Sequence, residues 1–162
     1  LVTVLFAKGI QNIAYLGSNM DQMVNRCRYQ GYEEAYRKGK RKLNQDLVYT
    51  DLSSKAMVEK AVEELKKSGV ECILCQDDYI CDEAVRKLSH MGVRIPDQMK
   101  VASCHYSRIL ENYPVTVTSL KFNITELGRR SCQVLLDMIH GKTVPDKTLL
   151  DYEIILKEST KG

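Results

Sequence analysis

Three side chains of different chemistry follow predicted strands and could form one polar site. Arg28 lies near the start of a predicted helix behind the first strand, Asp77 follows a central strand, and His105 follows the next strand. A forked cation, a carboxylate and an imidazole around a crevice suit a small polar ligand with hydroxyl groups or a carboxylate. The alternative is that Arg28 and Asp77 form an ordinary surface ion pair. The adjoining loops are expected to add three lining residues to this crevice: Ser18, Asn19 and Tyr79.

Other common site chemistries have little support in the sequence. Cys72 and Cys75 lie three residues apart on a predicted strand, so their side chains point to opposite faces and do not share a metal ion. No glycine-rich phosphate loop or G-x-S-x-G elbow occurs, and the three histidines are scattered. The basic run 37–42 is interpreted as a solvated helix end. We therefore expect no metal, no cofactor and no catalytic residue.

Composition limits the class of protein. The chain has 162 residues, 44% of them hydrophobic, which fits a single domain, and its net charge of +3 is too small to indicate nucleic-acid binding by itself. No apolar run approaches the roughly 20 residues of a membrane span. Most of the six cysteines lie in apolar segments, which is typical of the reducing cytoplasm. Because the chain starts at Leu1 within an amphipathic pattern, we interpret it as a fragment.

The stretch 70–88 is predicted to be the centre of the fold. An apolar run at 70–75 indicates a buried strand, and Ala84, Val85 and Leu88 follow at helical spacing. Between them, Asp78 is predicted to cap the helix, which leaves Asp77 at the carboxyl edge of the strand. In open α/β sheets this edge is where ligands bind.

Strands and helices alternate along the whole chain. This order predicts an α/β fold with a parallel sheet and helices on both faces. The predicted strands are 12–17, 47–52, 70–75, 100–104, 115–120 and 149–156. The predicted helices are 1–8, 23–38, the segment from Ser53 or Ser54 to Gly69, 78–91 and 123–140.

Five segments stand in order along the chain: Arg28-Tyr29-Gln30-Gly31-Tyr32 with Glu34-Ala35, Asp77 to Ala84, Gly92 to Asp97, Val117 to Leu120 with Glu126-Leu127-Gly128, and Lys157 to Thr160. Together they resemble motifs of the lactose/galactose repressor (LacI/GalR) family of transcription regulators. Asp77 stands where that family usually has an asparagine, and His105 stands where it usually has an aspartate, so the resemblance does not imply an ordinary sugar effector.

The resemblance implies a periplasmic-binding-protein-like (type I) fold in which residues 1–162 form a single effector-binding and dimerisation lobe. Helix 123–140 would belong to the crossover to a missing amino-terminal lobe. Operator DNA would be bound only through a separate DNA-binding domain. The implied partners are a small, sugar-like effector and a second copy of the chain, with the helix 78–91 and the loop 106–113 as the homodimer face.

Two other functions stay open. A periplasmic or secreted sugar-binding protein of a transport system has the same fold, and an α/β enzyme is a more distant alternative. One further expectation concerns helix 123–140, which carries an apolar row. We expect this row either to dock on its own lobe or to be buried against a second copy of the chain. The row comprises Ile124, Leu127, Val134, Leu135, Met138 and Ile139.

Overall fold

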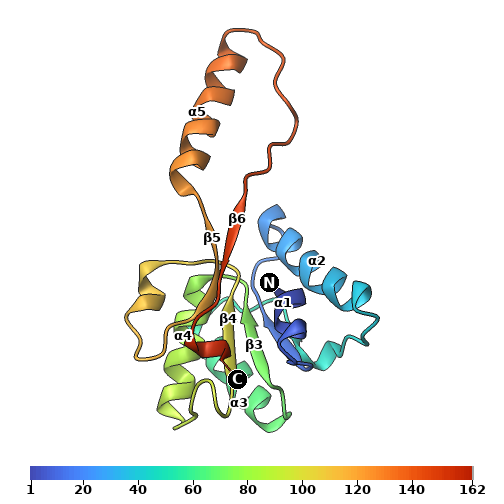
Figure 1. Ribbon diagram of the computed structural model, residues 1–162, viewed down its shortest axis with the longest axis vertical. Coiled ribbons are helices and arrows are strands. Elements are labelled where there is room, and N and C mark those ends of the chain that lie inside the picture. Colours follow the sequence, from blue (N-terminus) through green and yellow to red (C-terminus); the bar gives the residue numbers. More distant parts are fainter. Residues whose placement is uncertain (162) are drawn as a thin grey trace.

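The computed structural model describes residues 1–161, which form a six-stranded sheet flanked by helices and extended by a long arm (Figure 1). Across the sheet the strands follow the order β2-β1-β3-β4-β5-β6. The strands are β1 (Ile13–Leu16), β2 (Val48–Tyr49), β3 (Cys72–Cys75), β4 (Lys100–Ser103), β5 (Thr118–Phe122) and β6 (Tyr152–Ile155). The helices are α1 (Val2–Ala7), α2 (Met23–Lys38), α3 (Lys55–Lys67), α4 (Asp78–His90) and α5 (Ile124–Ile139). Short 3-10 turns occupy Gln45–Leu47, Arg108–Glu111 and Glu158–Thr160.

The predicted α/β class is confirmed, with one correction to the sheet. Strands β1 to β5 pair in parallel, whereas β6 runs antiparallel to β5. The chain leaves the sheet along β5 and returns along β6 after α5, so the two strands form a ribbon instead of a βαβ crossover. The largest differences from the predicted bounds are three residues at one end of a strand: β2 ends at Tyr49, β5 begins at Thr118 and β6 begins at Tyr152.

Side chains of the central strand alternate between two separate cores. Cys72 and Leu74 pack with α1 and α2, whereas Ile73 and Cys75 pack with α3 and α4. All four are buried, as the period of two in a strand requires. The two cysteines therefore lie on opposite faces of the sheet, and the structural interpretation of this pair is confirmed.

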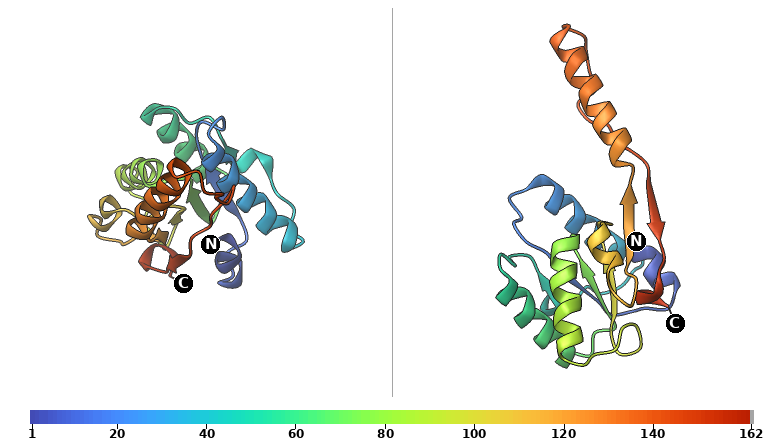
Figure 2. Two further views of the ribbon diagram at one scale, coloured as in Figure 1. Left: turned by 90° about the horizontal axis from the view of Figure 1, so that it is seen from above. Right: turned by 90° about the vertical axis from the view of Figure 1, so that its left-hand side faces the viewer.

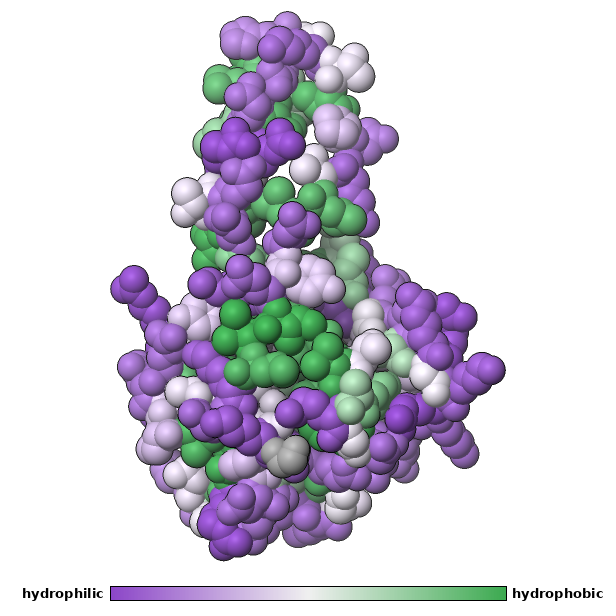
Figure 3. Space-filling model, viewed as in Figure 1, coloured by the Kyte–Doolittle hydropathy of each residue, from purple (hydrophilic) through white to green (hydrophobic). Residues whose placement is uncertain are grey.

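The arm formed by β5, α5 and β6 stands away from the body of the molecule (Figures 1 and 2). No residue of α5 is buried, and hydrophobic residues are exposed along the arm (Figure 3). Ile124, Leu135 and Ile139 are 66%, 58% and 69% exposed. The expectation that this row docks on its own lobe is therefore wrong. The two strands that connect α5 to the body, β5 and β6, continue outward beyond the rest of the sheet. They hold α5 away from the sheet.

Hydroxyl groups fix the carboxyl-terminal turn to the body. Ser159 Oγ accepts a hydrogen bond from Thr118 N (2.9 Å) and donates one to Val101 O (2.6 Å). Thr118 Oγ1 and Thr160 Oγ1 lie 2.7 Å apart, and these side chains are fully buried. Because buried backbone groups require partners, this network stabilises the junction of β4, β5 and the chain that returns from the arm.

Candidate functional site

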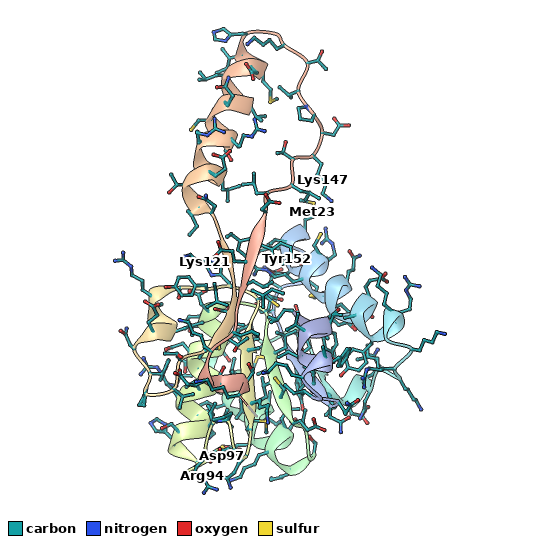
Figure 4. All side chains as sticks on the ribbon, in the orientation of Figure 1. Met23, Arg94, Asp97, Lys121, Lys147 and Tyr152 are labelled. Atoms are coloured by element: carbon teal, nitrogen blue, oxygen red, sulfur yellow. The ribbon has the colours of Figure 1, made fainter. Side chains whose placement is uncertain are left out.

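The candidate site lies at the edge of the sheet from which the arm rises. Met23, at the start of α2, lies toward the same end of the body as Lys121 and Tyr152 at the base of the arm, whereas Arg94 and Asp97 lie at the opposite end of the molecule (Figure 4). Since β5 runs parallel to β1, β3 and β4, this is the carboxyl edge of all these strands. Ligands of open α/β sheets bind at that edge.

One pocket at this edge collects five of the six residues that the sequence predicted. It has a volume of about 940 Å³ and lies among the loop after β1, the loop after β2 and the starts of α2 and α4. Hydroxyl, amide, carboxylate and guanidinium groups line it together with a few apolar side chains. The predicted residues in its wall are Arg28, Ser18, Asn19, Asp77 and Tyr79.

Arg28 is a partly buried cation with no salt bridge in the described part of the chain. Arg28 lies in the second turn of α2, and its side chain lines the pocket. The alternative of an Arg28–Asp77 surface ion pair is therefore wrong. An unpaired guanidinium that faces a polar pocket is a donor for ligand oxygens, because its five N–H groups need acceptors.

The roles predicted for the two adjacent aspartates are reversed. Asp77 is the N-cap of α4, and its Oδ1 accepts a hydrogen bond from Ile80 N at 2.9 Å. Asp78 is the first residue of the helix and pairs instead with His105. The helix begins at Asp78, as predicted, and the extended backbone of Asp77 (φ −147°, ψ 179°) places this residue, one position before the helix, as the cap. Asp77 also lines the pocket.

His105 is separated from the other five predicted residues. Its Nδ1 lies 3.2 Å from Asp78 Oδ1, and its ring stacks on Phe122 of β5 with 6.4 Å between the centroids. It lines a second cavity of about 490 Å³ at the base of the arm, with Tyr106 and Tyr152. The expectation of one crevice for all six residues is thus wrong for His105, although both cavities open on the same edge of the sheet.

Two buried amides position the loop after β1. Gln76 Oε1 accepts hydrogen bonds from Ser18 N (3.2 Å) and Tyr15 Oη (3.3 Å). Asn25 Nδ2 donates to the carbonyl oxygens of Ser18 (2.9 Å) and Asn19 (3.0 Å). These contacts hold Ser18 and Asn19 in the pocket wall.

Gly17 allows this close approach. A Cβ atom there would lie 2.6 Å from the Tyr15 ring and 2.7 Å from Gln76 Oε1, which real Cβ contacts do not tolerate. Gly17 therefore brings the buried Gln76 side chain directly against the loop.

Sequence reasoning missed Gln76, Asn25 and the residues that follow β2. Thr50 and Asp51 both line the pocket, and they come directly after Tyr49, the last residue of β2. The rule that led to Asp77 would have led to them, since polar residues behind any parallel strand reach the same edge. Gln76 carried the same signal, because it is the first polar residue after an apolar strand.

Ionisation in and near the site does not produce a nucleophile. Burial raises the pKa of the Cys104 thiol to about 11, so this thiol is protonated at neutral pH. Burial likewise raises the pKa of the Tyr15 phenol, which bonds to Gln76. Within residues 1–161 no group of three or more His, Cys, Asp or Glu side chains is arranged to hold a metal ion.

Comparisons with known proteins identify the family of this chain. The family model of the periplasmic binding protein-like domain matches residues 2–160. The chain belongs to this family. Curated relatives include the HTH-type transcriptional regulator CelR of Thermobifida fusca, which is 27% identical over 158 residues and matches 96% of this chain. The resemblance to LacI/GalR regulators is confirmed, and these relatives are regulators, not enzymes.

Solved structures show the same fold. The chain superposes with a TM-score of 0.86 on a transcriptional regulator CelR–cellobiose complex at 25% identity, covering 97% of this chain and 49% of that one. A LacI family regulator from Bifidobacterium animalis subsp. lactis gives a TM-score of 0.85 at 21% identity, covering 98% of this chain and 58% of that one. The chain spans about half the length of the curated relatives that it matches. None of the helices in residues 1–161 is long and apolar enough to cross a bilayer.

Proposed function

We propose that this chain is the effector-binding lobe of a LacI/GalR-type transcription regulator, and that its ligand is a small, sugar-like molecule. The observation that carries the proposal is the unpaired Arg28 in a polar pocket at the carboxyl edge of a parallel sheet. The proposed ligand contacts are Arg28, Asp77, Ser18, Asn19 and Tyr79, with His105 as a contact from the neighbouring cavity.

The lining of the pocket fits a polyhydroxylated ring. Its hydroxyl, amide and guanidinium groups can donate hydrogen bonds to sugar hydroxyls, and its hydroxyl and carboxylate oxygens can accept them. Tyr79, which is 62% exposed, offers an aromatic face for the apolar side of a ring. The relative of known structure named as a complex with cellobiose supports a sugar. The departures at Asp77 in this pocket and at His105 in the neighbouring cavity set the ligand specificity apart from the family pattern.

The arm supports a second lobe in the intact protein. Helix α5 leaves the sheet at the edge that carries the pocket, and its exposed apolar row requires a packing partner. We propose that α5 belongs to the amino-terminal lobe, which would cover the pocket and form a cleft between two lobes. A DNA-binding domain outside residues 1–162 would contact the operator, which places the regulator in the cytoplasm, where bacterial DNA lies.

We propose that two copies associate through α4 and the loop 106–113. Leu110 of this loop is buried, and Tyr113 Oη donates a hydrogen bond to Asp82 of α4, so the helix and the loop form one continuous surface. Ile109 is 47% exposed on it. A dimer is also what the recognition of two operator half-sites requires. A strictly monomeric intact protein at micromolar concentration in analytical ultracentrifugation would contradict this interface.

Without its second lobe, the chain 1–162 should bury the α5 row against a second copy, by exchange of the arm. Sedimentation of this chain, compared with a variant carrying Leu127→Lys and Ile139→Lys, tests the point. The natural sequence should form a larger assembly than the charged variant, which keeps only the interface through α4. If both sediment alike, exchange through α5 does not occur.

The pocket lacks the parts of a catalytic site. No nucleophile with an adjacent base lines it, and the Cys104 thiol, which lies nearby, is protonated. We therefore propose a binding function without catalysis and without a cofactor.

Isothermal titration calorimetry with monosaccharides and disaccharides tests the proposed site. The intact protein should bind at least one sugar, and Arg28→Ala should weaken binding by roughly tenfold or more, because a buried charged hydrogen bond is lost. Arg37→Ala is the matched control, since Arg37 lies on the same helix, is exposed and pairs with Glu34. Equal sugar affinity in the Arg28 variant and the wild type would exclude Arg28 as a contact.

A further inference from the structure

The pocket carries a net negative charge, although its proposed anchor is an arginine. Its lining contains three carboxylates, those of Asp21, Asp51 and Asp77, and one cation, Arg28, so the formal charge is one minus three, or −2. None of the three carboxylates forms a salt bridge within residues 1–161. A concave, negatively charged surface concentrates cationic ligands and repels anionic ones.

We propose that the effector carries an ammonium group besides its hydroxyl groups, as an amino sugar does, and that Asp77 is the residue that selects it. This inference rests on the proposed function of the same pocket. It excludes sugar acids and sugar phosphates as preferred ligands, because Arg28 alone would attract them and three carboxylates would oppose them.

Asp77 is the best placed of the three acids. Its Oδ1 is held by Ile80 N, whereas its Oδ2 has only a 3.4 Å contact with Gln76 Nε2, which is longer than an ordinary hydrogen bond. The Oδ2 atom therefore has acceptor capacity toward the pocket. Asp77 is partly buried, while Asp21 and Asp51 are exposed and screened by solvent. A charged donor and a carboxylate form a short, strong hydrogen bond in such surroundings.

The cap at Asp77 allows a clean variant. Asparagine caps helices as well as aspartate does, so Asp77→Asn keeps the hydrogen bond to Ile80 N and removes the negative charge. Asp51→Asn removes an exposed charge from the same pocket and serves as the matched control. Thermal unfolding of both variants verifies that they fold like the wild type.

The test is calorimetry of the intact protein with matched sugars: glucose, galactose and cellobiose, each with its amino and N-acetylamino counterpart. We expect an amino sugar to bind roughly tenfold or more tightly than both neutral forms at pH 6. Asp77→Asn should reduce this difference to within about twofold, whereas Asp51→Asn should keep most of it. Added salt should weaken binding of the amino sugar only.

Three results would overturn the inference. The wild type could bind a neutral sugar through Arg28 without preferring the amino sugar. The preference for the amino sugar could survive in Asp77→Asn, or Asp77→Asn and Asp51→Asn could reduce it equally. The first of these leaves the proposed function standing. If the wild type binds no sugar of any kind, the proposed function fails, and the inference fails with it.

Discussion

Replacement of Ser159 by alanine should destabilise the protein at the point where the arm returns to the body. The hydroxyl joins Thr118 N and Val101 O, and both backbone groups belong to fully buried residues. Each buried group left without a partner costs about 1–3 kcal/mol, so for the two groups we expect a loss of about 2–6 kcal/mol. That is a large part of the roughly 5–15 kcal/mol that stabilises a typical domain.

Urea unfolding followed by circular dichroism measures this loss. With an m value of about 2 kcal/mol/M, the midpoint should fall by about 1–3 M while m stays unchanged. Ser131→Ala is the control, because Ser131 is exposed and its hydroxyl bonds only to Leu127 O within α5, so its change should stay within about 0.5 kcal/mol. A Ser159→Ala midpoint as high as that of the control would refute the argument that this network stabilises the junction.

Two further predictions concern the edge of the sheet. Burial alone would raise the pKa of Asp78, but neighbouring hydrogen-bond donors, His105 among them, hold it below its usual value. A carboxyl with a lowered pKa stabilises the fold above its unfolded-state pKa of about 3.9 and loses this effect as the pH falls through the folded value. Asp78→Asn should therefore lower the free energy of unfolding at pH 7 but not at about pH 2, and equal losses at both pH values in urea titrations would contradict this. Gly17→Ala should cost about 1–3 kcal/mol by forcing a methyl group onto Tyr15 and Gln76. A midpoint unchanged from the wild type would show that the loop gives way without cost.

The central strand and helix were predictable because their signals are local. The apolar run that ends at Cys75, followed by helical spacing up to Leu88, fixes both elements and the face that each buries. The position of the cap was not predictable. Asp77 and Asp78 are the same residue type, and only the point where the extended backbone ends decides between them.

Features that depend on distant parts of the chain could not be predicted in the same way. The alternation of strands and helices does not encode the direction of β6, which follows from the path of the arm. The amphipathic pattern of α5 shows that its apolar face needs a surface to pack on but does not identify that surface. The position of His105 depends on contacts with Asp78 and Phe122, which are distant from it in the sequence. By contrast, Arg28 was predicted in its pocket because parallel strands bring their carboxyl ends to one edge.

We propose that effector binding at the Arg28 pocket controls DNA binding by the intact protein. Fluorescence anisotropy of labelled operator DNA, titrated with the sugar that binds, tests it most directly. The sugar should change the affinity for the operator in the wild type and in Arg37→Ala, and should have no effect in Arg28→Ala at the same concentrations. If the DNA affinity of Arg28→Ala responds to the sugar as that of the wild type does, the effector site lies elsewhere and the account is contradicted.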